Sequence, residues 1–314
     1  MVVERIAVIG AGLMGHGIAQ LFAARGHHVS LYDVSEEALS RARKEMLGIC
    51  ELLGQDRSVA DRIACSIDLR ETARDADVVI EAVPEKPELK RKIFRDLDSF
   101  CRPDALLASN TSVIPIRMIA EPVRDKGRVM GAHFWNPPYL VPLVEVVEAT
   151  ETQREASDRM MALLARVGQE PVRVKKDIPG FIGNRLQHAL KREAIALVAN
   201  GVCDAETVDR VIKLGFGARL GVIGTLEQSD MVGLNLTLDI HRNVMFDLDV
   251  TPEPHALLEK LVAEGHLGMK TGKGFYDWTD ERAAAVRQRL RTFLARQIAE
   301  RRAAATESST KTQG

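Results

Sequence analysis

Residues 5–15 read Arg5-Ile6-Ala7-Val8-Ile9-Gly10-Ala11-Gly12-Leu13-Met14-Gly15. The apolar run over residues 6–9 is typical of a strand that is buried on both faces. In the pattern that follows, Gly10 permits a tight turn, Gly12 lets the backbone approach a ligand, and Gly15 lets a helix pack close to the strand. Because a helix begins directly after these glycines, its N-terminus offers N–H groups to phosphates. The stretch therefore predicts a dinucleotide-binding loop between a strand and a helix.

An acidic residue at the end of the second expected strand supports this interpretation. Asp33 lies 18 residues beyond Gly15, where a carboxylate can accept hydrogen bonds from the adenosine ribose. A carboxylate there would repel a 2′-phosphate, which favours NAD over NADP. The alternative is a glycine-rich turn that binds no ligand. We expect NAD as the cofactor, bound by Gly10, Ala11, Gly12, Leu13, Met14, Gly15 and Asp33.

Strand and helix patterns alternate over the first 150 residues. Gly26 ends the first helical pattern, and Ser35 is a good N-cap for a helix that begins at residue 36. Short apolar runs that suit buried strands recur at residues 29–32, 77–80, 105–108 and 128–132. This alternation predicts an α/β fold with a Rossmann-like, doubly wound sheet.

The strand patterns stop near residue 178. Helical patterns then fill residues 181–200, 205–213, 226–245 and 254–264. We therefore expect a Rossmann NAD-binding domain over residues 1–177, followed by an all-helical domain over residues 178–314. Within the second domain, residues 280–302 indicate an exposed charged helix. The small polar residues from about 303 onward are expected to form a disordered tail.

Composition narrows the classes of partner. The 314 residues are 46% hydrophobic and 28% charged, with a formal net charge of −1, so we expect neither a nucleic-acid nor a membrane partner. There is no signal-peptide pattern, and no apolar run reaches the roughly 18 residues that a membrane helix needs, which favours the cytoplasm. We expect no metal site, because none of the cysteines has zinc-ligand spacing; they are Cys50, Cys65, Cys101 and Cys203.

A histidine follows the fourth of these later strand patterns. His133 comes directly after Ala132, at the carboxyl edge where ligands bind in sheets of this type. Glu145 stands in an apolar run, where a carboxylate is costly unless it is paired. The two residues can form a general-base pair for oxidation of a hydroxyl group. The alternative is a structural histidine and an unrelated glutamate at a strand edge.

Several motifs, in this order, resemble those of one family. They are Ser109-Asn110-Thr111-Ser112, His133-Phe134-Trp135-Asn136-Pro137, Leu143-Val144-Glu145-Val146-Val147, Pro179-Gly180-Phe181-Ile182-Gly183-Asn184-Arg185, Asp230-Met231-Val232-Gly233-Leu234 and Thr271-Gly272-Lys273-Gly274-Phe275-Tyr276. Together they look like the 3-hydroxyacyl-CoA dehydrogenase family, over about residues 3–278. The resemblance implies an NAD-dependent enzyme that oxidises a hydroxyl group to a ketone by hydride transfer.

The resemblance also implies roles for individual residues. His133 would be the general base and Glu145 its partner, while Ser112 and Asn184 would hydrogen-bond the reacting oxygen or the nicotinamide-side groups. Substrate would lie between the domains, and the helical domain would form a homodimer interface. The further cofactor contacts would be Glu85 and Lys90 near the nicotinamide ribose, Asn136 at the nicotinamide end, and Lys270 from the second domain.

Some of these residues have a plainer structural interpretation. Ser112 can cap the helix that follows it, and Asn184 can be an exposed helix residue. Lys90 can be a solvated charge on a helix, and Lys270 a charge on a loop. In favour of a role for Asn184, it stands just after a Pro-Gly pair at the expected domain junction.

Two features depart from the family pattern. Many members that act on acyl-CoA carry a lysine where this chain has Pro142, and a basic helical hairpin that meets the CoA phosphates. Here residues 48–63 contain only Arg57 and Arg62 as bases. The segment Trp135-Asn136-Pro137-Pro138-Tyr139 also resembles side branches that oxidise small alcohols without CoA, of the gulonate, carnitine and pyridine-carboxylate types. Two substrate classes therefore stay open: a short-chain 3-hydroxyacyl-CoA and a small hydroxy acid or alcohol.

Overall fold

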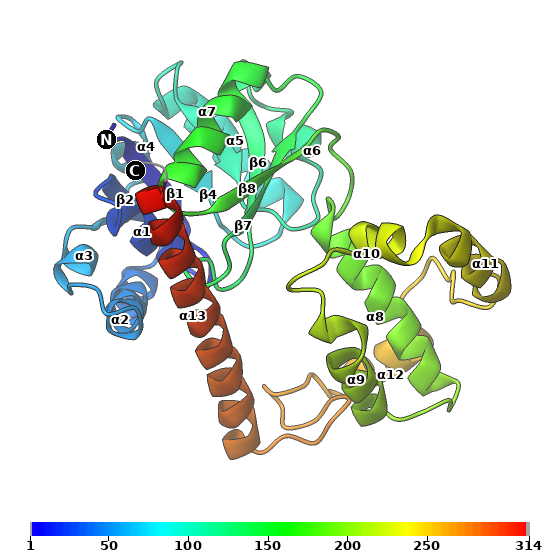
Figure 1. Ribbon diagram of the computed structural model, residues 1–314. Helices are drawn as coiled ribbons and strands as arrows, with labels where there is room; N and C mark the ends of the chain where they lie inside the picture. The colour runs from blue at the N-terminus through cyan, green and yellow to red at the C-terminus, as the bar shows by residue number, and fades with distance from the viewer. Residues whose placement is uncertain (1, 312–314) are drawn as a thin grey trace. The chain divides into compact units, whose positions relative to one another are not determined.

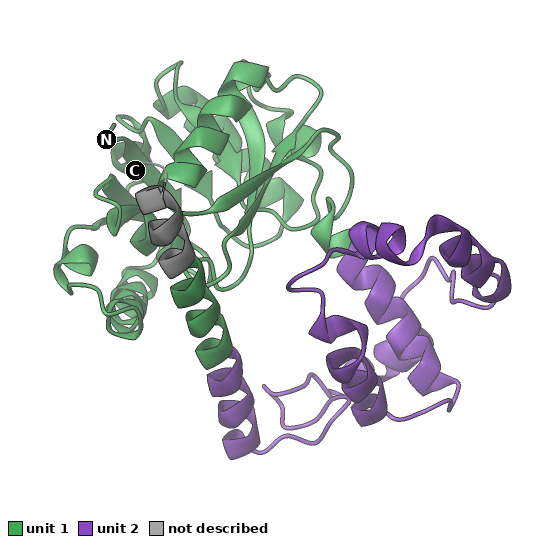
Figure 2. Ribbon diagram, in the orientation of Figure 1, with its two compact units in different colours: residues 1–185, 291–314 green, residues 186–290 purple. Residues whose placement is uncertain are grey.

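The computed structural model describes residues 2–311, with side chains as far as residue 301. The chain divides into two compact units (Figure 2). Unit 1 comprises residues 1–185 and 291–314, and unit 2 comprises residues 186–290. The expected boundary near residue 178 stays a prediction, because a compact unit of the structure need not coincide with a domain of the sequence.

Unit 1 is built on one eight-stranded sheet (Figure 1). The order of strands is β3-β2-β1-β4-β5-β6-β7-β8. Strands β1 to β6 run parallel, whereas β7 and β8 run in the opposite direction. Their bounds are β1 Arg5–Ile9, β2 His28–Tyr32, β3 Ala64–Ser66, β4 Val78–Glu81, β5 Leu106–Ser109, β6 Val129–Phe134, β7 Leu143–Glu148 and β8 Glu170–Val174. The predicted fold class, a doubly wound α/β sheet, is confirmed.

Helices cover both faces of this sheet, because alternate strand residues point to opposite faces. Residues of α1, α2 and α7 share one core with Val8 and Ile80, whereas residues of α4, α5 and α6 share another with Ile9 and Val79. The predicted cap at Ser35 is present, since its Oγ accepts a hydrogen bond from the N–H of Ala38. The helices are α1 Gly15–Ala23, α2 Glu36–Leu52, α3 Ser58–Asp61, α4 Leu69–Ala73, α5 Pro87–Phe100, α6 Ile116–Ala120 and α7 Arg154–Arg166, with a 3₁₀ turn, η1, at Lys126–Arg128.

After β8 the described residues contain helices and isolated bridges but no strand of the sheet, as predicted. The expected single helix over residues 226–245 is wrong. It is broken at Gly233, whose φ of 98° lies in a region that glycine adopts readily and that a continuous helix excludes. The elements are α8 Gly183–Ala199, α9 Ala205–Leu214, η2 Phe216–Ala218, α10 Thr225–Val232, α11 Leu234–Val244, α12 Ala256–Ala263 and α13 Asp280–Lys311.

Helix α13 crosses from unit 2 into unit 1 and extends beyond the expected charged helix. The expected disordered tail, from about residue 303, falls partly on the last turns of α13 and partly on residues 312–314, which lie outside the described residues. It stays a prediction. Among the helices described, none combines the length and the apolar character that a bilayer crossing requires.

The fold gathers most of the predicted site residues at one edge of unit 1. The glycine loop follows β1, Asp33 follows β2, and Glu85 lies just beyond β4. Ser112 lies just beyond β5, and His133 is the next-to-last residue of β6. Parallel strands end at the same edge of a sheet, and in open α/β sheets ligands bind outside that edge.

Candidate active site

The glycine loop between β1 and α1 is closed on one side and open on the other. Gly10 has a φ of 106°, and a Cβ at this position would lie 2.7 Å from the carbonyl oxygen of Ala82. By contrast, a Cβ on the exposed Gly12 would have no neighbour within 4 Å. The loop is therefore packed tightly against β4, while its outer face leaves room for a phosphate to approach the backbone.

The start of α1 and the end of β2 complete this part of the site. Helix α1 has no side-chain cap at Met14 and no acidic residue in its first turn, so its N-terminal N–H groups can meet an anion. The Asp33 carboxylate accepts hydrogen bonds from the N–H of Ala11, at 2.9 Å, and of Ser35, at 3.1 Å. It is thereby fixed beside the glycine loop. These residues fit a dinucleotide, with the loop toward the pyrophosphate and Asp33 toward the adenosine ribose.

His133 and Glu145 are paired by the register of two antiparallel strands. They are direct partners between β6 and β7, so their side chains lie on the same face of the sheet. His133 Nδ1 lies 2.8 Å from Glu145 Oε2, and the two residues are only 5% and 1% exposed. An ionised carboxylate only accepts hydrogen bonds, so Nδ1 carries the proton and Nε2 keeps the free lone pair. The geometry thus presents a base nitrogen at Nε2.

The second oxygen of Glu145 is held by the start of α8. Oε1 accepts hydrogen bonds from the N–H of Ile182, at 2.9 Å, and of Gly183, at 3.0 Å. Burial alone would raise the pKa of Glu145, but the hydrogen bond from His133 and the two backbone N–H groups outweigh it and lower the pKa. The carboxylate is therefore kept ionised beside the imidazole.

Two aromatic rings enclose the imidazole of His133. The ring centroids of Trp135 and Phe181 lie 5.6 Å and 5.7 Å from that of His133. Phe181 is fully buried and has a φ of 51°, which is unusual for a side chain other than glycine. This backbone conformation lets the chain turn into α8 directly after Phe181, and so brings the α8 N–H groups onto Glu145.

Ser112 and Asn184 are also brought together. Asn184 Nδ2 donates a hydrogen bond to the backbone carbonyl of Ser112, at 2.9 Å. Both residues are half-buried, so neither the simple cap expected of Ser112 nor an exposed Asn184 describes them. Because Asn184 directly follows Gly183, the contacts continue from His133 through Glu145 and the start of α8 to Ser112.

Glu85 and Lys90 add further contacts around Ser112. Glu85 Oε1 accepts hydrogen bonds from the N–H of Ser112, at 3.0 Å, and from Thr111 Oγ1. Lys90 is not a solvated helix charge: it is 1% exposed, and its Nζ lies 3.3 Å from Glu85 Oε2 and 2.7 Å from Glu81 Oε1. Sequence reasoning missed Glu81. Its signal was an acid that ends the apolar run of β4.

Asn136 and Lys270 remain predictions. Asn136 is exposed and lies two residues beyond β6, on the side of the sheet where the other site residues gather. Lys270 is exposed and belongs to unit 2, in the segment between α12 and α13.

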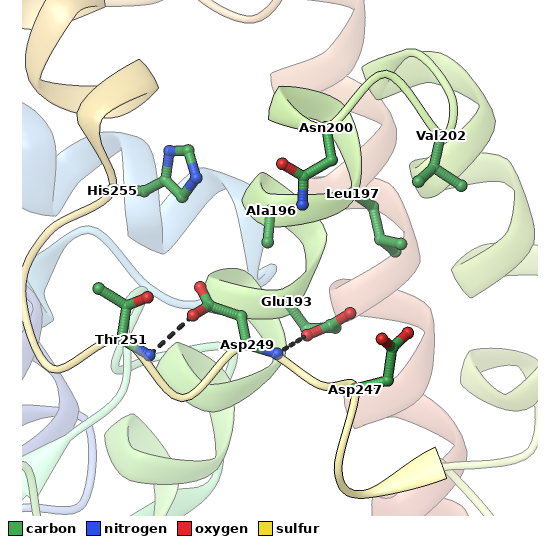
Figure 3. A pocket seen from close by; sticks show the side chains of 9 residues that line it. All are labelled: Glu193, Ala196, Leu197, Asn200, Val202, Asp247, Asp249, Thr251 and His255. Carbon is green, nitrogen blue, oxygen red and sulfur yellow. Dashed lines mark hydrogen bonds between the residues drawn. The ribbon is translucent and has the colours of Figure 1, made fainter. Parts of the chain in front are cut away.

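Unit 2 contains a pocket of about 380 Å³ that is separate from these residues (Figure 3). Two backbone hydrogen bonds order its wall: the N–H of Asp249 donates to Glu193 Oε2 at 2.8 Å, and the N–H of Thr251 donates to Asp249 Oδ1 at 2.7 Å. The first of these contacts fastens the chain after α11 to α8, which gives Glu193 and Asp249 a structural role.

Family models and known proteins match most of the chain. Models of the 3-hydroxyacyl-CoA dehydrogenase NAD binding domain and C-terminal domain match residues 5–178 and 180–278. A probable 3-hydroxybutyryl-CoA dehydrogenase of Bacillus subtilis is 40% identical over 290 residues, covering 90% of this chain and 99% of that protein.

Two solved structures are similar along most of the chain. The structure of 5-formyl-3-hydroxy-2-methylpyridine 4-carboxylic acid 5-dehydrogenase, an NAD⁺-dependent dismutase, is 32% identical, with a TM-score of 0.88, and covers 95% of this chain and 99% of that chain. The structure of (S)-3-hydroxybutyryl-CoA dehydrogenase from Ralstonia eutropha is 31% identical, with a TM-score of 0.73, and covers 89% of this chain and 100% of that chain.

A Rossmann-type sheet, an open glycine loop and a buried histidine–carboxylate pair together define an NAD-dependent oxidoreductase. The chain belongs to the 3-hydroxyacyl-CoA dehydrogenase family. The predicted family, enzyme class and cofactor are thereby confirmed. The roles of the individual site residues stay predictions.

The lowered pKa of Glu145 predicts how stability depends on pH. The pKa in the folded chain lies below the ordinary glutamate value of about 4.3. Its stabilising contribution is therefore complete above that value and is lost as the pH falls through the folded pKa. We expect the free energy of unfolding of Glu145→Gln to be about 1–3 kcal/mol lower than that of wild type at pH 7. This difference in free energy should become smaller below about pH 4.3.

Urea denaturation at a series of pH values measures this difference. The exposed Glu151, just after β7, supplies a control, since Glu151→Gln should leave the free energy of unfolding nearly unchanged. A constant difference between Glu145→Gln and wild type from pH 7 to pH 3 would contradict the assignment.

Proposed function

We propose that this protein oxidises the hydroxyl group of its substrate to a carbonyl, with His133 as the general base and NAD as the hydride acceptor. The substrate is either a 3-hydroxyacyl-CoA thioester or a small hydroxy acid or alcohol. The observation that carries this proposal is the pairing of His133 Nδ1 with Glu145 Oε2 at 2.8 Å, which directs the free lone pair of Nε2 away from Glu145. The pair lies on β6 and β7 in the unit that carries the NAD-binding domain.

The proposed mechanism uses groups already in contact. His133 Nε2 takes the hydroxyl proton while the carbinol carbon gives up its hydrogen as hydride and becomes a carbonyl carbon. Bound NAD supplies the hydride acceptor. Glu145 stabilises the imidazolium that forms, and Ser112 and Asn184 bind the reacting oxygen. In the reverse direction the same imidazolium returns the proton.

For the substrate we propose first a short-chain 3-hydroxyacyl-CoA. Membership of the family supports this class, as does the B. subtilis relative, which is named as a probable 3-hydroxybutyryl-CoA dehydrogenase. The exposed Arg41, Arg43 and Lys44 on α2 are candidates to meet the CoA phosphates.

The segment after β2 favours a second candidate, a small hydroxy acid or alcohol without CoA. Helix α3 is only four residues long, so the basic helical hairpin of acyl-CoA members is not developed here. Arg41 is paired with Glu37, and Arg43 Nη2 lies 2.7 Å from Asp61 Oδ1, which leaves fewer free cations for phosphates. The similarity to the pyridine-carboxylic acid dehydrogenase over 95% of this chain agrees with this candidate.

Replacement of the base tests the mechanism. We expect His133→Ala to lower kcat by about 10²–10⁴-fold, because proton removal from the hydroxyl loses its acceptor. NADH binding, measured by fluorescence titration, should be nearly intact. His28→Ala, at an exposed position on β2, is the control and should keep wild-type turnover. Turnover by His133→Ala within a factor of about three of wild type would exclude His133 as the base.

A matched pair of substrates separates the two substrate classes. Oxidation of NADH at 340 nm is followed with acetoacetyl-CoA and with free acetoacetate, and reduction of NAD is followed with a panel of small hydroxy acids. The first candidate predicts a kcat/KM at least about 100-fold higher for the thioester, because the CoA moiety adds binding energy. Turnover confined to free acids would reject the first candidate, and turnover confined to thioesters would reject the second.

We also propose a homodimer formed through unit 2, in a cytoplasmic protein. Large apolar side chains of this unit are exposed, among them Val222, Leu226 and Phe246 at 91%, 83% and 80%. Monomeric proteins rarely expose extensive apolar patches, which supports a second chain as the cover. Light scattering after gel filtration should give twice the 34.6 kDa mass of the chain. A mass of one chain at micromolar concentration would contradict the dimer.

A further inference from the structure

The carboxylate of Glu81 is fully buried at the end of β4 and takes no part in the mechanism above. It accepts three hydrogen bonds, from the N–H of Val83 at 2.7 Å, from Ser109 Oγ at 2.6 Å and from Lys90 Nζ at 2.7 Å. It therefore joins the ends of β4 and β5 to helix α5, which carries Lys90.

Burying this carboxylate has an energetic cost. Burial raises the pKa of Glu81, against the opposing charge of Lys90, which reflects the cost of removing the ionised group from water. A buried ion pair often stabilises a fold no better than apolar side chains of the same volume. What the pair does provide is a fixed position for the Lys90 ammonium.

The ammonium of Lys90 in turn contacts the carboxylate of Glu85 and helps to hold it in place. Lys90 Nζ lies 3.2 Å from the carbonyl oxygen of Val83 and 3.3 Å from Glu85 Oε2. Lys90 Nζ therefore donates hydrogen bonds to Glu81 and to the Val83 carbonyl and forms an ion pair with Glu85. The Glu85 side chain is 36% exposed and contacts two buried residues, Lys90 and Thr111.

Glu85 in turn holds the segment that carries Ser112. Its Oε1 accepts hydrogen bonds from the N–H groups of Ser112, at 3.0 Å, and Val113, at 3.2 Å, and from Thr111 Oγ1. Burial opposes ionisation of Glu85, but the hydrogen bonds from this segment and the charge of Lys90 lower its pKa. One carboxylate thus fixes three consecutive residues just beyond β5.

We propose that Glu81 is a positioning residue: through Lys90 and Glu85 it fixes the segment of residues 111–113, and so sets where Ser112 meets the reacting oxygen and the nicotinamide side of the cofactor. The inference rests on the proposed function of Ser112. Its structural part, the dependence of the segment on Glu81, can be measured without turnover.

The experiment compares Glu81→Gln with wild type in the full-length protein. The glutamine amide can present an N–H to Lys90, which displaces the ammonium from β4 and draws Glu85 away from the segment. We expect backbone amides of residues 112 and 113 to exchange hydrogen at least about tenfold faster, and the Kd for NADH to rise by about tenfold. Where turnover is measurable, kcat should fall.

A buried carboxylate on α5 provides the matched control. Asp98 is 6% exposed and accepts from Arg124 and Arg128, at 2.7 Å and 2.8 Å, but no contact joins it to residues 111–113 among the described residues. Asp98→Asn should lower the melting temperature without changing amide exchange at residues 112 and 113 or the Kd for NADH. If amide exchange and the Kd for NADH changed equally in Glu81→Gln and Asp98→Asn, Glu81 would only stabilise the fold, and the proposal would be overturned.

A milder variant covers the case in which Glu81→Gln does not fold. Glu81→Asp keeps both charges but shortens the side chain by one methylene, which draws the carboxylate away from Lys90 Nζ; it should show the same changes at residues 112 and 113, at about threefold. Unchanged amide exchange and unchanged NADH binding in a folded Glu81→Gln, or in Glu81→Asp where the first variant does not fold, would overturn the proposal. A wild-type chain that binds NADH but turns over no substrate would count against the proposed function alone, because exchange and NADH binding still report on Glu81.

Discussion

The site depends on one buried carboxylate. Glu145 is 1% exposed, and both of its oxygens are hydrogen-bonded. One oxygen pairs with the imidazole of His133, and the other accepts from the N–H groups at the start of α8. A carboxylate removed from water needs such partners, and without them it would take up a proton. Because the same group joins β7, β6 and the first residues of α8, the orientation of the imidazole and the start of α8 are fixed together.

The parallel sheet explains why the other polar groups lie within reach. Strands β1, β2, β4, β5 and β6 end at the same edge, and each contributes residues at or just beyond its end. The glycine loop and Asp33 lie on one side of this edge, and His133 lies on the other. Between them, Glu85 and Lys90 connect the end of β4 with the segment after β5. A single sheet edge thus carries both the glycine loop and the proposed general base.

Much of the fold could be predicted, because its patterns are local. The buried strands show as apolar runs and the glycine loop as a spacing, and the sheet class follows from the alternation of strands and helices. Strand β8 was not foreseen: it is partly exposed and its residues alternate in burial, so no apolar run marks it. The break at Gly233 was missed for a related reason, since the apolar pattern continues through it although the backbone turns. At the site, the structure describes the contacts of the four expected catalytic residues, but their roles stay predictions. These residues are Ser112, His133, Glu145 and Asn184.

By itself, the sequence determined the types of residue and the order in which they follow the strands: a glycine loop, an acid after the second strand, and a histidine after a buried run. Only the tertiary structure decided which of them touch. His133 meets Glu145 because β6 and β7 pair in one register, and a shift by one residue would turn the carboxylate to the other face. Lys90 is buried against Glu81 rather than solvated because α5 packs its side chain under the end of β4. Contacts between residues far apart in the chain follow from register and packing, which no short stretch of sequence encodes.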